Sequence, residues 1–189
     1  LRAASLEHKL GIHASPTAVM SFGDDGGAIG YLIGQENRGI EYMFTMMNNA
    51  RTGVGREGMA IAERAYQQAR EYARTRIQGR SIADPAAGPV AIVQHADIRR
   101  TLVGMKAEIE AMRALAYTVA AGLDVARRHD DPSVRVRHQA RADLLVPVLK
   151  AWCTDRGVAI ASDGVQVHGG AGFIEETGAA QHYRDSRIT

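Results

Sequence analysis

The chain has 189 residues, of which 46% are hydrophobic and 23% charged, enough for one substantial globular core. Its formal net charge of +2 is too small to make nucleic acid or a membrane surface the expected main partner. Cys153 is the only cysteine, so an internal disulfide is excluded, and its place beside Trp152 favours a buried structural thiol. We find neither a secretory leader nor an apolar run long enough to span a bilayer, and therefore expect a cytoplasmic protein.

The N-terminal part of the chain has β-leaning composition. Residues 17–22 and 28–33 are two such runs, and residues 23–27 between them are glycines and aspartates, which favour a turn. This pattern predicts a β-hairpin. A hairpin alone is marginal in water, so we expect these strands to belong to a sheet whose other strands precede Leu1.

Helical patterns follow. The first predicted helix covers residues 39–76, with apolar residues at near-heptad spacing: Met43, Met47, Ala50, Val54, Ile61 and Ala65. The second has the clearest periodicity, with steps of four and three: Ile98, Leu102, Met105, Ile109, Met112, Ala116, Val119 and Leu123. Both stripes indicate helices that bury one face.

A third predicted helix begins at Asp131, whose carboxylate can cap free amides, with Pro132 in the first turn, and runs towards Gly164. A short fourth helical piece follows Thr177. The predicted fold is therefore mainly α, a helical bundle with a short N-terminal β-hairpin.

Gly169, Gly170 and Gly172 stand where the third predicted helix ends. Glycine lets backbone amides approach a phosphate because no Cβ intervenes, and a following helix start adds partial positive charge. A helix that must stop and turn also requires glycine. The cluster alone therefore leaves both explanations open.

The residues around this cluster form a longer motif: Gln166, Gly169, Gly170, Gly172, Phe173, Tyr183, Arg184, Asp185, Arg187 and Ile188. This order resembles the C-terminal helical domain of the acyl-CoA dehydrogenases, FAD enzymes that oxidise acyl-CoA thioesters. Residues 9–17, 31–39 and 41–47 resemble the larger bacterial members. The resemblance implies that residues 1–35 are the end of the middle β-domain. It implies that residues 36–189 are the C-terminal domain, an up-down four-helix bundle, without its last segment. We expect further sequence at both ends.

The resemblance also implies a cofactor site shared between subunits. Gln166, Gly169 and Gly170 match residues that hold the adenosine diphosphate half of FAD from a neighbouring subunit. Arg76 and Gln78 lie in a segment similar to one whose arginine reaches the FAD phosphates across the subunit interface. These five residues are the candidate cofactor ligands, and a homodimer or homotetramer is implied.

Asn48 and Arg51 match positions that contact the CoA thioester in the family. A guanidinium offers several fixed donors to carbonyl and phosphate oxygens, although a surface salt bridge is the alternative for Arg51. The family's catalytic glutamate is expected just beyond Thr189. The implied activity is oxidation of an acyl-CoA to the 2,3-enoyl-CoA, with electrons passing from FAD to electron-transfer flavoprotein or a similar acceptor.

Two other functions remain open. One is a catalytically inert bundle used for assembly. The other is a DNA-binding relative of the dehydrogenases, supported by a group of arginines that is otherwise explained as a solvated helix face: Arg127, Arg128, Arg135, Arg137 and Arg141. Duplex binding with a steep salt dependence would favour the second.

Overall fold

The computed structural model describes the backbone of residues 1–189 and every side chain except those of Asn48 and Ala87. The principal elements are β1 (Arg2–Leu6), β2 (Ala18–Ser21), α1 (Gly39–Thr75), β3 (Ile77–Arg80), β4 (Pro89–Ala91), α2 (Ala96–Arg128), α3 (Pro132–His168) and α4 (Ala179–Ser186). Four 3-10 helices lie between them: η1 (Pro85–Ala87), η2 (Ile92–Gln94), η3 (Gly169–Phe173) and η4 (Glu175–Thr177). The fold is mainly helical, as predicted.

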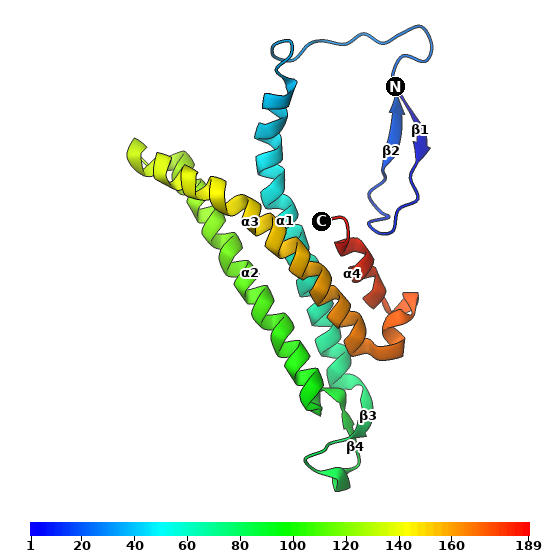
Figure 1. Ribbon diagram of the computed structural model, residues 1–189. Coiled ribbons are helices and arrows are strands. Elements are labelled where there is room, and N and C mark those ends of the chain that lie inside the picture. The colour runs from blue at the N-terminus through cyan, green and yellow to red at the C-terminus, as the bar shows by residue number, and fades with distance from the viewer.

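Three long helices form the bundle, and the short α4 lies beside it (Figure 1). α3 packs against α1, α2 and α4, and α1 also contacts α2 and α4. Buried side chains from α1, η2, α2 and α3 make one core: Ala62, Tyr66, Ala69, Ala73, Ile92, Leu102, Met105, Ile109, Met112, Ala116, Val119, Val146, Leu149, Cys153, Ile160 and Val167. The small β3–β4 sheet joins α1 to α2 at one end of the bundle (Figure 1).

The predicted apolar stripe of α2 is confirmed. Six of its eight residues are buried, and Ile98 and Leu123 pack against the core. The stripe predicted for α1 is wrong in its first half, where Met43 is 42% exposed and Ala50 is exposed. The hydrophobic residues that α1 buries are mostly small and lie further along: Ala62, Ala65, Tyr66, Ala69 and Ala73.

The start of α3 is also as predicted. Asp131 precedes Pro132, and its carboxylate accepts a hydrogen bond of 2.8 Å from the Ser133 amide, which lowers the pKa of Asp131. Arg135 donates from Nη1 to the His129 carbonyl at 2.7 Å. One member of the arginine group thus closes the turn between α2 and α3.

The predicted hairpin between residues 17–22 and 28–33 is wrong. β2 pairs instead with β1, in an antiparallel arrangement with Leu6 opposite Ala18. Gly23 has φ of 80°, and residues 28–33 form no strand. The chain turns away from β2 after Ser21 because glycines with positive φ follow it, so the N-terminal hairpin is built from earlier residues than expected.

Cys153 lies in the core with no exposed surface, which confirms the expectation of a buried thiol. Burial raises its pKa to about 11 from 9.0, so the neutral, poorly nucleophilic thiol dominates at physiological pH. Within the described residues, no helix has both the length and the apolar character needed to cross a membrane.

Candidate functional site

One hollow, here called the glycine-side hollow, lies where α3 ends beside β3. Its volume is about 370 Å³. Three of the five candidate cofactor ligands, Gln78, Gln166 and Gly169, line it together with Tyr72 and His168. The fold therefore brings residues from two segments nearly ninety positions apart to one place.

The β3 side of this hollow is held by His95, at the start of α2. Its Nε2 lies 2.8 Å from the Gln78 carbonyl oxygen, to which it donates. Gly79 follows with φ of 69°, a left-handed conformation that glycine adopts without a Cβ clash. The Ile92 amide donates to the Arg76 carbonyl at 2.9 Å, so two hydrogen bonds, at Arg76 and at Gln78, hold the chain where it leaves α1.

The α3 side is held by His168, which is only 5% exposed. Its Nδ1 donates to the Gly164 carbonyl at 2.7 Å, and its ring centroid is 4.5 Å from that of Tyr72. This contact packs the end of α3 against α1 at the residue that precedes the glycine cluster. Neither histidine was a predicted site residue, because a single histidine within a helical pattern carries no distinctive signal.

The glycine cluster combines the two explanations that the sequence left open. Gly169 and Gly170 are exposed, and a methyl group added to either would meet nothing within 4 Å. Gly172 is buried, and a methyl group there would lie 2.4 Å from the Val165 carbonyl oxygen. Packing requires Gly172, and the φ of 58° at Gly169 favours glycine where α3 ends. Both Gly169 and Gly170 nevertheless leave open backbone that a ligand can approach.

The remaining candidate residues lie outside the lining of this hollow. Arg76 is exposed immediately after α1, at the same end of the bundle. Gly170 is exposed on η3. Arg51 is half-buried on α1, and Asn48 lies one turn earlier, with its side chain outside the described residues. Arg51 lies one helical turn before Val54, and Val54 lines a second hollow.

This second hollow, the α4-side hollow, lies between residues 9–17, α1 and the end of α4, and has a volume of about 600 Å³. Its apolar lining includes Leu10, Ile12, Val54 and Ile188, and charged residues also border it: Lys9, Glu57, Arg184 and Arg187. Thr189 reaches it as well. The sequence motifs at residues 9–17 and 183–188 gave no indication that they would meet here.

α4 is attached to α1 through Gln68, a half-buried residue. The Gln68 Oε1 accepts a hydrogen bond of 2.8 Å from His182 Nε2, and its amide nitrogen donates to the Thr177 carbonyl. One glutamine thus orients both α4 and η4. Burial, followed by the nearby Arg64 charge, lowers the pKa of His182 below its ordinary value of 6.5.

Acidification is expected to weaken this attachment. Because the folded state holds the pKa of His182 below 6.5, the unfolded chain takes up the proton first. The contribution of neutral His182 to the free energy of unfolding is therefore complete above about pH 6.5. It is lost as the pH falls towards the lowered pKa that His182 has in the folded state. Urea unfolding at pH 7.5 and 5.5 should show a larger loss of stability for the wild type than for His182→Gln. His8→Gln, at an exposed position, should match the wild type, and equal losses in all three proteins would contradict the assignment.

The arrangement of the helices is that of the acyl-CoA dehydrogenase C-terminal domain. ACDH-11 of Caenorhabditis elegans, solved in complex with C11-CoA, superposes with a TM-score of 0.84 at 24% identity, covering 100% of this chain and 29% of that protein. Butyryl-CoA dehydrogenase of Megasphaera elsdenii gives a TM-score of 0.76 at 26% identity, with 99% and 43% covered.

Residues 37–189 match the family described as acyl-CoA dehydrogenase, C-terminal domain, and the chain belongs to this family. It is 54% identical over 188 residues to 3-methylmercaptopropionyl-CoA dehydrogenase of Ruegeria pomeroyi, covering 100% of this chain and 31% of the relative. It is 33% identical to the broad-specificity linear acyl-CoA dehydrogenase FadE5 of Mycobacterium tuberculosis, covering 97% and 31%. The chain therefore spans about a third of the length of these relatives.

Proposed function

We propose that this chain is part of an FAD-dependent acyl-CoA dehydrogenase that converts an acyl-CoA to the 2,3-enoyl-CoA. Membership of the family supports this, and its relatives include 3-methylmercaptopropionyl-CoA and butyryl-CoA dehydrogenases. The observation that carries the proposal is the meeting of Gln78, Gln166 and Gly169 around the glycine-side hollow. The 54% identity makes a short thioether-bearing acyl group the first substrate to test.

The donors at this end of the bundle suit the adenosine diphosphate half of FAD. Gly169 and Gly170 expose backbone without a Cβ, which lets amides approach phosphate oxygens. Gln78 and Gln166 add side-chain amides for hydroxyl or phosphate groups. Arg76, exposed at the same end, supplies a positive charge with several fixed donors. FAD, when bound, supplies the hydride acceptor of the reaction.

The other roles follow from the family. Arg51 and Asn48 would bind the CoA thioester along α1, and a glutamate beyond Thr189 would take the α-proton. A homodimer or homotetramer would complete the cofactor site from two subunits, and electron-transfer flavoprotein or a similar acceptor would reoxidise the flavin. A cytoplasmic location is part of the same proposal.

The test is an anaerobic visible spectrum of the protein expressed from its complete reading frame, before and after a panel of acyl-CoAs. We expect bound flavin that bleaches with at least one short acyl-CoA. Flavin that stays oxidised with every thioester, or a protein without flavin, would overturn the proposal.

A pair of variants tests the cofactor residues separately. Gln166→Ala should weaken flavin retention about 10-fold, because a hydrogen bond to a charged group contributes roughly 1.5–3 kcal/mol. Gln94→Ala is the matched control, since Gln94 is exposed on η2 and outside the hollow. Equal flavin retention in both variants would remove Gln166 from the site.

A further inference from the structure

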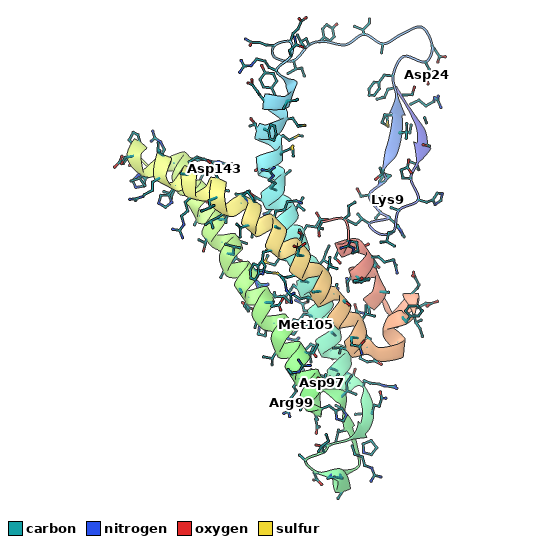
Figure 2. The ribbon with its side chains drawn as sticks, in the orientation of Figure 1. Lys9, Asp24, Asp97, Arg99, Met105 and Asp143 are labelled. Atoms are coloured by element: carbon teal, nitrogen blue, oxygen red, sulfur yellow. The ribbon has the colours of Figure 1, made fainter. Side chains whose placement is uncertain are left out.

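The loop between β1 and β2 is attached to α4, although the two lie at opposite ends of the sequence. Asp185 Oδ1 accepts a hydrogen bond of 2.7 Å from the Ile12 amide, 173 residues away. Figure 2 shows Lys9, on the same loop, next to the C-terminal end of the chain. The bond is partly buried and therefore shielded from competing water.

The loop backbone rests directly on α4. A methyl group at Gly11 would lie 2.6 Å from Asp185 Oδ1 and 2.8 Å from the Arg184 carbonyl carbon. Ile12 has φ of 49°, which a β-branched residue rarely adopts. Such a conformation persists only where the surroundings over-determine it, and Asp185 holds the Ile12 amide in place.

Hydrogen bonds within the loop make it one unit. His13 Nε2 donates to the Lys9 carbonyl at 2.8 Å, and Lys9 Nζ donates to the Ser15 carbonyl. The Ser15 amide donates to the Ile12 carbonyl at 3.3 Å. A displacement of Ile12 from Asp185 would therefore move the whole loop.

This loop is one wall of the α4-side hollow. Lys9 and Ile12 line the hollow from the loop, while Ile188 and Thr189 line it from the chain that follows Asp185. Asp185 itself is not part of the lining. It can therefore influence this hollow through the position of the loop, without touching an occupant.

We propose that Asp185 is a positioning residue for the dehydrogenase reaction, because it holds the loop of residues 9–17 against α4 as the wall of the α4-side hollow. This inference rests on the proposed function. Under that function, the segment after Thr189 carries the base, so the loop and the base-bearing segment approach the same hollow from two sides. Misplacement of such a wall by about 1 Å is enough to slow a reaction by two orders of magnitude.

The experiment compares variants of the protein expressed from its complete reading frame. Asp185→Ala should raise hydrogen exchange at the Ile12 amide at least about 10-fold, because the loop opens without global unfolding. It should lower kcat about 10- to 100-fold, with a smaller change in KM and unchanged flavin content. Asp185→Asn keeps an oxygen that can accept a hydrogen bond from the Ile12 amide. This variant should therefore show Ile12 exchange and kcat close to the wild-type values.

Asp143→Ala is the matched control. Asp143, labelled in Figure 2, accepts a hydrogen bond of 2.8 Å from Gln139 four residues earlier, as Asp185 accepts one of 3.3 Å from Gln181. Asp143 is exposed on α3. Of the two carboxylates, Asp185 is the one that accepts a hydrogen bond from the Ile12 amide. Asp143→Ala should leave Ile12 exchange and kcat at wild-type values.

A second pair covers the case in which Asp185→Ala fails to fold. Gly11→Ala places a methyl group between the loop and α4 while Asp185 remains, and should also raise Ile12 exchange and lower kcat. Gly30→Ala, with nothing within 4 Å of the added methyl, should change neither. Unchanged exchange or unchanged kcat in both Asp185→Ala and Gly11→Ala would overturn the proposal. Wild-type flavin that no acyl-CoA reduces would refute the function alone, since the exchange measurement still tests the attachment.

Discussion

Gly157→Ala is expected to lower the free energy of unfolding by about 1–3 kcal/mol, because added volume in a closely packed contact forces the backbone apart. The methyl group would lie 2.8 Å from the Gly58 carbonyl oxygen. A methyl group at Gly58 would in turn lie 2.9 Å from the Cys153 carbonyl oxygen and 3.0 Å from Thr154 Cα. α1 and α3 therefore meet backbone to backbone, and neither can move without disturbing the core.

Urea unfolding of Gly157→Ala and Gly104→Ala checks this expectation. Gly104 lies within α2, and a methyl group there meets nothing within 4 Å. Gly104→Ala should therefore raise the free energy of unfolding by about 0.5–1 kcal/mol through helix propensity alone. If Gly157→Ala gained stability in the same way, α1 and α3 would not be in close backbone contact at Gly58 and Gly157.

The second large effect is expected for Gly172→Ala. Its methyl group would lie 2.4 Å from the Val165 carbonyl oxygen and 3.0 Å from His168 Cβ, inside a buried turn. We expect a loss of about 1–3 kcal/mol in the free energy of unfolding. Because the same turn carries Gly169 and Gly170, flavin retention should fall with it.

Gly170→Ala separates the packing requirement of this turn from its proposed contact with FAD. The added methyl group meets nothing within 4 Å, so stability should stay within about 0.5 kcal/mol of the wild type. Flavin retention should nevertheless fall, because a Cβ would stand where a phosphate approaches. Calorimetry of both variants measures their stability, and flavin absorbance measures how much cofactor they retain. A stable Gly172→Ala protein, or full flavin in Gly170→Ala, would contradict this division of roles.

Elements that depend on local chemistry could be predicted from the amino-acid sequence alone. The stripe from Ile98 to Leu123 predicted α2 because its apolar residues recur on one helical face. Asp131 and Pro132 predicted the start of α3 because capping acts within one turn. The motif from Gln166 to Phe173 also pointed to the family, since its glycines stand at fixed positions along the chain.

The segments that meet from distant parts of the chain could be identified only in the packed fold. β2 pairs with β1, and α1 buries the surface that its neighbours cover. The periodicity of the sequence does not identify these neighbours. The close approach of Gly58 and Gly157 requires two helices to be placed together first. The same holds for Gln78 beside Gln166 and for Asp185 at the Ile12 amide. Local patterns predict each helix, but contacts between remote residues arise only when the helices pack, because packing selects among many faces that are locally equivalent.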